Sequence, residues 1–346
     1  MLLKYFDKID LLNKNEYISS AEGIRINITN KRSGKERVVY DISGDLGYNS
    51  LGHGWVNKKL KEIDMPIMLP NNFYREKEDE LSDLLTQTFK FDYSFQSTTG
   101  HEAVEIFLSM NKDKNIYKLR DEFHGRTQAI VNIKEVNDFN KPLKENDALI
   151  FEPFKGKEGG FKKISEEEVD FIKASQENGA IICADEIQTS FFKVGKLLAS
   201  EYYNIKPDVV LLGKPLGQGL PISAILTNDN KNFAWSSTFS GNNISTTIGI
   251  ESVNEHIKRK DEFISNSQIF ENMIGKAVGN SVFGFSGTFE NDKMTWKDYF
   301  RNNSIPLLLN SYRKFPNKFK FLCPLVISRY EIYNTAYAIY KSIYVE

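Results

Sequence analysis

The sequence predicts an α/β fold built on a doubly wound, mostly parallel β-sheet, with a smaller α+β domain formed by the two ends of the chain. Two short apolar runs, Ala180–Cys183 and Val209–Leu212, are separated by a helical segment, and each is followed at once by polar residues. This spacing is typical of neighbouring strands in a parallel sheet. The segment Glu78–Phe89 has apolar residues at helical spacing, as expected of a helix that covers such a sheet.

Composition places the chain among globular proteins that are large enough for two domains. It has 346 residues, of which 40% are hydrophobic and 26% charged, and its 45 basic and 46 acidic residues leave a net charge of −1. This balance gives no general attraction to nucleic acid or to an anionic membrane. We divide the chain into a large cofactor-binding domain, residues 43–245, and a small domain made from residues 1–42 and 246–346.

The cysteines and the N-terminus both indicate a cytoplasmic protein. Cys183 and Cys323 each lie in an apolar stretch, so we expect buried free thiols in a reducing compartment rather than a disulfide. The first 16 residues carry charges throughout and lack the apolar core of a secretory leader. No run approaches the roughly 20 apolar residues that span a bilayer.

The first elements are a lead-in and a glycine-rich loop. After a short helix, Arg25–Asn30 and Arg37–Ile42 are β-like segments on either side of a turn. Ser43–Trp55 is rich in Gly, Asn and Ser, so we predict a loop with unusual backbone angles.

A polar Thr/Gly turn in Gln96–Met110 runs directly into a helix. The free backbone N–H groups and the positive dipole end of such a helix can bind a phosphate. A plain N-cap by Thr98 or Thr99 explains the same pattern, and these residues alone leave both interpretations open. In the next turn, an aromatic-His-Gly-Arg sequence, Phe123 and His124 taken alone suit a core position and a hydrogen-bonded structural position.

The following elements alternate between short strands and capped helices. Ala148–Phe151 is a strand that ends in Glu152, and Ser165–Glu168 is a capping box that opens a helix. Ile244–Ile257 is predicted as a helix. After further strand-like pieces, the chain closes with a terminal helix that begins at a second capping box, Ser328–Glu331.

The polar residues that follow Ala180–Cys183 and Val209–Leu212 form the candidate site. Asp185 and Gln188 follow the first run, and Lys214 follows the second. In open α/β sheets, ligands bind beyond the carboxyl ends of the strands. A carboxylate, an amide and an amine are therefore expected at one crevice, a set that suits a cofactor with a basic ring nitrogen and an aldehyde.

Spacing argues against two nucleotide-binding motifs and against a metal site. Gly213-Lys214-Pro215 lacks the Ser/Thr and the earlier glycine of a phosphate-binding loop. Gly217-Gln-Gly219 does not continue as G-x-G-x-x-G, and the four His and two Cys show no metal-ligand spacing.

The order of several motifs resembles the class III, ornithine/acetylornithine-type, aminotransferases, which are fold-type I pyridoxal-phosphate (PLP) enzymes. The resemblance runs from SGDLGYNSLGH (residues 43–53) to FKFLCPLVIS (319–328). Its most specific segments are ADEIQTSFFKVGKL (184–197) and KPDVVLLGKPLGQGLPISAIL (206–226). STTGHEA, EFHGRT, FEPFKGKEGG and STFSGNN are weaker individually but occur in the family's order.

This resemblance implies PLP as the cofactor and a role for each residue at the strand ends. Lys214 would form a Schiff base with the aldehyde of PLP and would then carry the substrate proton, which requires a lowered pKa. Asp185 would keep the pyridine nitrogen protonated, and Gln188 would hydrogen-bond the phenolic oxygen. His124 and Arg126 would support the turn that carries Phe123.

The resemblance also implies residues for the phosphate and for one face of the ring. Thr99, Gly100 and His101 match the family's Ser-Gly-Thr phosphate turn, with His101 an unusual occupant. Thr238 matches the threonine that reaches the phosphate in the neighbouring subunit, and Phe123 matches the aromatic residue that stacks on the ring. The implied enzyme is a homodimer with shared active sites.

Departures from the family's pattern concern the substrate. Lys320 stands where the family has an arginine that grips the substrate carboxylate, although a shift of two residues would bring Lys318 there; lysine lacks the planar fork of arginine. Glu158 is the candidate for the glutamate that pairs with that arginine. Asp45 is a carboxylate in a loop that lines the substrate pocket in the family. It would either bind an amino group of the substrate or be an exposed loop residue. The segment 127–148 is short, which leaves the pocket more open or filled by another element.

The resemblance implies an aminotransferase that moves an amino group between a donor, such as an ω-amine or a diamino acid, and an oxo acid or aldehyde. The altered site at Lys320 leaves a second interpretation, a PLP-dependent decarboxylase, lyase, mutase or racemase on the same fold. A third is a PLP-binding relative without turnover, although the intact Lys214 and Asp185 argue against it. The expected partners are small molecules and a second subunit.

Overall fold

A computed structural model describes most of the chain. It describes residues 15–69, 74–157, 160–229, 237–278, 282–290, 307–308, 310–312 and 315–344. Where the sequence predicts a short helix before Arg25, the described part of that segment forms a strand, Glu16–Glu22. Residues 1–14 and Glu158 lie outside these stretches.

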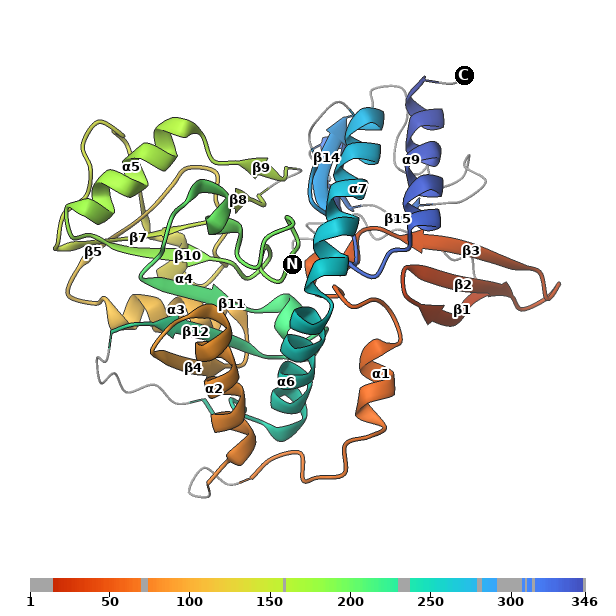
Figure 1. Ribbon diagram of the computed structural model, residues 1–346, viewed down its shortest axis with the longest axis horizontal. Coiled ribbons are helices and arrows are strands. Elements are labelled where there is room, and N and C mark those ends of the chain that lie inside the picture. The colour runs from red at the N-terminus through yellow and green to blue at the C-terminus, as the bar shows by residue number, and fades with distance from the viewer. Residues whose placement is uncertain are drawn as a thin grey trace.

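A seven-stranded sheet forms the centre of the molecule (Figure 1). Its strands lie in the order β4-β12-β11-β10-β7-β5-β6. Strand β12 is antiparallel to β4 and β11, whereas the other neighbouring pairs are parallel. The strands are β4 (Tyr93–Ser97), β5 (Asn115–Lys118), β6 (Lys134–Glu135), β7 (Asp147–Phe151), β10 (Ile181–Asp185), β11 (Val209–Leu212) and β12 (Ser223–Thr227).

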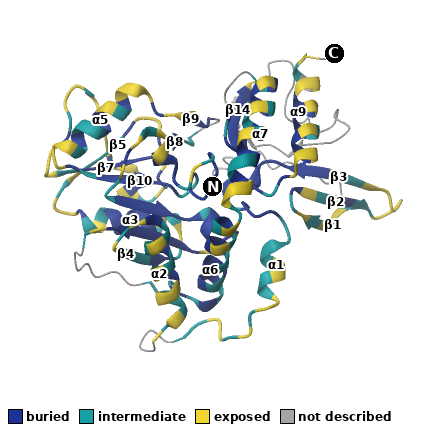
Figure 2. Cartoon of the chain, in the orientation of Figure 1, coloured by how far each residue is buried: buried dark blue, intermediate teal, exposed yellow. Residues whose placement is uncertain are grey.

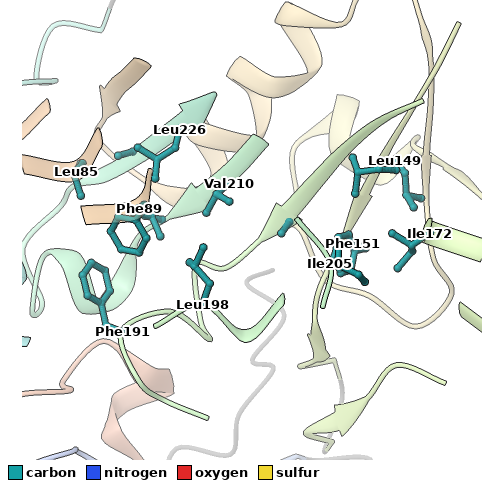
Figure 3. Packing of buried hydrophobic residues seen from close by; sticks show 14 of the residues in the cluster. Leu85, Phe89, Leu149, Phe151, Ile172, Phe191, Leu198, Ile205, Val210 and Leu226 are labelled. Atoms are coloured by element: carbon teal, nitrogen blue, oxygen red, sulfur yellow. The ribbon is translucent and has the colours of Figure 1, made fainter. Parts of the chain in front are cut away.

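The central strands form at short apolar runs because both of their faces are buried. Successive side chains of a strand point to opposite faces, and Val210 and Leu211 accordingly belong to two different hydrophobic clusters. Figure 3 shows the cluster around Val210, where the rings of Phe89 and Phe191 meet edge to face at 5.5 Å between centroids. Cys183 of β10 lies in the other cluster.

Helices cover both faces of the sheet, which confirms the predicted doubly wound α/β fold. Helix α3 packs Phe107 into the cluster of Leu211, whereas α2, α5 and α6 pack Leu85, Ile172 and Val253 against the opposite face. The outer faces of α2 and α5 are exposed, whereas α6 is mostly buried (Figure 2). The helices of this part are α2 (Glu76–Phe89), α3 (Gly100–Met110), α4 (Gln128–Val131), α5 (Glu166–Glu177) and α6 (Asn243–Lys258).

The two ends of the chain build a second core beside the central sheet. Ile24 and Ile42 pack in one cluster with Phe270, Phe321 and Ile339. Two four-stranded sheets, β1-β2-β3-β15 and β13-β14-β17-β16, belong to this part. Its elements are β1 (Glu16–Glu22), β2 (Arg25–Asn30), β3 (Glu36–Asp41), α7 (Lys260–Val278), β13 (Val282–Phe283), β14 (Ser286–Glu290), β15 (Leu307–Leu308), β16 (Asn310–Tyr312), β17 (Phe315–Leu322) and α9 (Arg329–Tyr344).

The remaining short elements lie in the connections between these strands and helices. Strands β8 and β9 pair with each other, and three 3₁₀ helices lie in loops of the described part of the chain. The short elements are α1 (Trp55–Leu60), β8 (Phe154–Lys155), β9 (Lys162–Lys163) and the 3₁₀ helices Gly44–Gly47, Ala199–Tyr203 and Lys214–Leu216. The division of the chain at residues 42 and 245 stays a prediction.

Several local predictions are confirmed. Ser165–Glu168 forms a reciprocal capping box at the start of α5, and Ser328–Glu331 makes the same pair of hydrogen bonds at the start of α9. Cys183 and Cys323 are buried free thiols. No helix in the described part of the chain has the length and apolar character needed to cross a membrane.

Candidate active site

A cavity of about 530 Å³ lies at the carboxyl ends of the central strands, where a parallel sheet presents its ligand site. Seven residues predicted from the sequence line it: Gly100, His101, Phe123, Asp185, Gln188, Lys214 and Lys320.

Strand geometry brings Asp185 and Lys214 to this edge. Strand β10 ends at Asp185, which pairs in register with Leu211 of β11, and β11 ends two residues before Lys214. Lys214 has a φ of 24°, in the left-handed region that costs non-glycine residues conformational energy. A Cβ on Gly213 would lie 3.1 Å from Ile187, so glycine allows the two strand ends to approach closely.

A buried histidine lies between two carboxylates beside the cavity. His124 Nδ1 is 2.8 Å from Asp185 Oδ2, and His124 Nε2 is 3.1 Å from Glu122 Oε2. Burial by itself lowers the pKa of His124, but the hydrogen bonds and charges of Asp185 and Glu122 outweigh it and raise the pKa to about 10. An imidazolium therefore donates to both carboxylates. The other oxygen of Asp185, Oδ1, accepts from the backbone N–H of Ile187 at 3.2 Å.

Glu152 is a further carboxylate at a strand end. It follows β7, and its Oε2 accepts from the backbone N–H groups of Phe123 at 2.8 Å and Gly156 at 3.3 Å. Burial raises the pKa of Glu152 to about 7, with the charge of His124 opposing the shift and that of Asp185 adding to it. A carboxyl group with such a pKa can give and take a proton near neutrality.

Lys214 presents its amine to this group of carboxylates. Its side chain is half-buried, and its accessible part faces the cavity. Burial lowers the pKa of Lys214 from its usual value, and the charges of Asp185 and Glu152 oppose the shift. A lowered pKa raises the fraction of neutral amine, the form that acts as nucleophile and base.

Lys320 and Gln188 are hydrogen-bonded to each other at another wall of the cavity. Lys320 Nζ lies 2.8 Å from Gln188 Oε1 and 3.1 Å from the carbonyl oxygen of Gly156, and Gln188 Nε2 donates to the carbonyl oxygen of Leu46 at 3.0 Å. A Cβ on Gly156 would lie 2.6 Å from Gln188 Oε1, so this packing requires glycine. Burial and the like charge of Lys214 lower the pKa of Lys320 to about 7.

The N-terminus of α3 faces the same cavity. Thr99 caps the helix by accepting from the backbone N–H of Glu102 at 3.3 Å, which confirms the N-cap. Gly100 and His101 of the first turn line the cavity, where free N–H groups suit an anion. A Cβ on Gly125 would lie 2.5 Å from the His101 ring, so the aromatic turn packs tightly on this helix.

The aromatic turn and α4 form the outer wall. Phe123 is 37% exposed and lines the cavity, so it is not the core residue that its type alone suggests. The Arg126 guanidinium lies 4.8 Å from the centroid of its ring. Ile130 and Val131 of α4 also line the cavity. The short segment 127–148 thus still supplies part of the wall.

Four predicted residues are not among the described residues that line the cavity, and Thr99, the N-cap of α3, is one of them. Thr238 is exposed in a turn before α6. Asp45 belongs to the first 3₁₀ helix, but its side chain lies outside the described part of the structure, as does Glu158. Their roles stay predictions.

Sequence reasoning missed the two glutamates of the site. The strand-end rule that identified Asp185 applies equally to Glu152, which directly follows the apolar run Ala148–Phe151. Glu122 carries no comparable signal. Its carboxylate is placed by the fold, where it accepts from the backbone N–H groups of Leu119 and Glu152.

Sequence comparisons identify relatives of this chain. The family model "Aminotransferase class-III" matches residues 132–279. The chain is 32% identical to a LysW-aminoadipate semialdehyde/glutamate semialdehyde transaminase of Pyrococcus furiosus over 58% of this chain and 63% of that protein, so the match spans slightly less than two thirds of this relative. The corresponding protein of Pyrococcus abyssi is 31% identical over 69% of this chain and 73% of its own length.

The fold has a close counterpart among solved structures. Ornithine δ-aminotransferase of Plasmodium falciparum superposes with a TM-score of 0.77 at 23% identity, covering 94% of this chain and 92% of that one. At this identity the likeness is one of fold, and it identifies the seven-stranded sheet as that of the fold-type I PLP enzymes. Together with the sequence relatives, it shows that the chain belongs to the class III aminotransferase family, whose members use PLP.

Proposed function

We propose that this chain moves an amino group between an ω-amine or diamino acid and an oxo acid or aldehyde, with PLP as its cofactor. The observation that carries the proposal is the meeting of Lys214 and Asp185 at adjacent strand ends in one cavity. The Pyrococcus relatives are named as semialdehyde transaminases and the Plasmodium enzyme as an ornithine δ-aminotransferase. These names support a donor whose reacting amine is remote from an α-carboxylate.

The groups that line the cavity fit PLP. Lys214 would bond the aldehyde carbon, and Asp185 would face the ring nitrogen while the imidazolium of His124 holds its other side. The start of α3 at Gly100 would hold the phosphate, and Phe123 would cover one face of the ring. When bound, PLP supplies an electron sink for the charge left on the donor carbon.

Lys214 is the group that would move the substrate proton. Its amine would accept the proton from the donor carbon as a general base and would give the proton up again as a general acid later in the same reaction. The lowered pKa suits this exchange, because an amine with an ordinary pKa is almost wholly protonated at neutral pH.

The contacts of Lys320 support a role in positioning Gln188 rather than in gripping a carboxylate. The carbonyl of Leu46 can only accept, so the atom of Gln188 that faces it is the amide nitrogen, and the amide oxygen therefore faces Lys320. The amide orientation is thereby fixed, which leaves its second N–H to bond the phenolic oxygen. A neutral amine has two protons for its two acceptors, in agreement with a pKa of about 7 for Lys320.

Lys320→Met is expected to lower kcat at least about tenfold with little change in KM. The variant leaves the oxygen of Gln188 and the carbonyl of Gly156 buried without their donor, at a cost of about 1–3 kcal/mol, and the amide can then rotate. Steady-state kinetics with donors that carry or lack a carboxylate measure the effect. Lys157→Met is the matched control, since Lys157 also lines the cavity. A rise in KM confined to carboxylate donors, with kcat intact, would assign Lys320 to substrate binding instead.

The subunit arrangement and the compartment are parts of the same proposal. The exposed position of Thr238 supports a contact with a neighbouring subunit, and hence a homodimer with shared active sites. The buried free thiols Cys183 and Cys323 support a cytoplasmic location.

The reaction of the purified enzyme with a donor alone tests the proposed reaction. We expect ω-amines and diamino acids to remove the visible absorption of the bound cofactor without a second substrate, and an added oxo acid or aldehyde to restore it. The measurement is absorbance across a panel of α-amino, ω-amino and diamino compounds. Release of carbon dioxide with unchanged absorbance would indicate a decarboxylase. No spectral change and no product with any donor would indicate a relative without turnover.

A further inference from the structure

A stripe of tyrosines covers the outer face of α9, which Figure 2 shows as exposed along the helix. The opposite face of α9 packs Ile332 and Ile339 into the core of the small part. Each tyrosine of the stripe is between 49% and 68% exposed. The tyrosine stripe consists of Tyr330, Tyr333, Tyr337, Tyr340 and Tyr344.

The spacing of the stripe is that of a helix–helix seam. Its tyrosines follow one another at steps of three, four, three and four residues along α9. At 3.6 residues per turn they fall within an arc of about 80°. Alternating steps of three and four residues are the pattern of the contact positions of a two-stranded coiled coil. Single exposed aromatic residues are ordinary on a protein surface, whereas a continuous row of five on one helix is not.

We propose that the tyrosine stripe is a docking surface for α9 of a second copy of this chain, with the two helices antiparallel about a twofold axis at Tyr337. Reversing the stripe about Tyr337 brings Tyr330 opposite Tyr344, and it brings Tyr333 to within one residue of Tyr340, so the order of the tyrosines along the stripe complements itself. A twofold interface requires this self-complementarity. The rings of Tyr340 and Tyr344 already contact each other, with 5.0 Å between centroids and a tilt of 39° between planes, which reduces the ordering that docking needs.

The charges at the edges of the stripe suit this pairing. Arg329 and Lys341 are exposed, whereas Glu331 is buried and bonded to Arg25 and Ser328 on the other side of the helix. In the antiparallel arrangement Arg329 would lie beside the C-terminal turn of the second helix, where the helix dipole favours a cation. Lys341 would lie over a tyrosine ring of the second copy.

The area of the stripe is sufficient for an association of modest strength. At about 200 Å² per tyrosine side chain, these exposed fractions amount to roughly 600 Å² on one copy. Two copies would bury roughly 1,200 Å², the lower end of the range for specific interfaces. We therefore expect an association that depends on concentration, with a Kd on the order of micromolar.

This interface is separate from the one implied by Thr238. Thr238 lies just before α6 in the large part of the molecule, whereas α9 lies at the far end of the small part (Figure 1). The inference rests on α9 alone and does not depend on the proposed reaction.

The mass of the assembly in solution tests the pairing. The purified full chain is expected to at least double in mass over the micromolar range in sedimentation or light-scattering measurements, since each proposed homodimer carries two stripes. Tyr337→Glu is expected to remove this step because it places two carboxylates on the axis. Tyr17→Glu, at an exposed tyrosine of β1, is the matched control and should keep the step. The donor-alone absorbance change should be the same in all three proteins, since α9 contributes nothing to the cavity.

Cross-linking tests the axis itself and does not depend on the fold tolerating glutamate. Under mild oxidation Tyr337→Cys is expected to give covalent pairs, whereas Tyr330→Cys alone should not, because Tyr344 is its counterpart. The two native cysteines are buried and do not interfere. An unchanged mass at every concentration together with no cross-linking of Tyr337→Cys would overturn the proposal.

Discussion

Lys214→Ala is expected to abolish amino transfer and to remove the visible absorption of the bound cofactor. The variant removes the amine at the end of β11 that we assign both to the bond with the aldehyde carbon and to the transfer of the substrate proton. Loss of a general base alone costs about 10²–10⁴-fold. We therefore expect kcat to fall by at least about 10³-fold, as measured by initial rates and by the absorbance of protein purified in the presence of PLP.

A matched lysine separates this effect from damage to the strand. Lys206 is exposed and precedes β11 at its opposite end, so Lys206→Ala should keep both rate and absorbance. Borohydride reduction of the wild-type protein, followed by peptide mass spectrometry, should place the cofactor on the peptide that contains Lys214. The same label on the peptide of Lys320 would show that the wrong amine had been assigned, since both lysines line the cavity.

Apolar runs and strand-end chemistry made the centre of the fold predictable. The run Val209–Leu212 coincides with β11, and Arg25–Asn30 coincides with β2. The local sequence is sufficient to predict each of these strands. Burial on both faces gives a continuous apolar run, and pairing across a short turn gives β-like segments on either side of turn residues. The rule that ligands bind beyond the carboxyl ends of parallel strands also predicts that Asp185 and Lys214 share one cavity, as they do.

The residues that the sequence could not supply depend on contacts between distant segments. Glu122 accepts hydrogen bonds from the backbone of its own turn and from the residue that follows β7. The order of strands in the sheet brings these two segments together, and the spacing of residues in the sequence does not indicate it. The bond between Lys320 and Gln188 joins residues 132 positions apart in the chain. The sequence predicts only that His124 supports its turn, because nothing in the sequence indicates that Asp185 and Glu122 will contact its ring.

Asp185→Asn is expected to lower kcat by about 10²–10³-fold while the protein stays folded. An amide cannot hold the ring nitrogen of PLP in its protonated form, and removal of one preorganised charge from an active site typically costs that much. The amide oxygen can still accept from His124 Nδ1, and Glu122 still faces the other nitrogen. The free energy of unfolding should therefore fall by only about 1–3 kcal/mol. Kinetics and thermal unfolding measure the two effects, and Asp170→Asn on the exposed side of α5 is the matched control.

The loss of stability in Asp185→Asn is expected to depend on pH, and the direction of this dependence follows from the pKa of His124. The folded protein raises the pKa of His124 to about 10, above the ordinary value of about 6.5. A raised pKa contributes stability that is fully present below the unfolded pKa and is lost as the pH rises through the folded one. Asp185 is the first of the groups that raise this pKa. The difference in Tm between the wild type and Asp185→Asn should thus be largest below about pH 6.5 and should narrow toward pH 10. A difference that widens with pH would contradict the imidazolium assignment.

A double-mutant cycle decides whether His124 acts through Asp185 or has a catalytic part of its own. His124 Nδ1 bonds the same carboxylate that we assign to the ring nitrogen, and the His124 ring is fully buried between Asp185 and Glu122. If His124 only positions Asp185 and supplies its counter-charge, His124→Gln should lower kcat in the wild type but add almost nothing in Asp185→Asn. Residues in direct contact give coupling energies of about 0.5–3 kcal/mol in such cycles. Effects on kcat that simply multiply would show that His124 reaches the reacting atoms by a route that does not pass through Asp185.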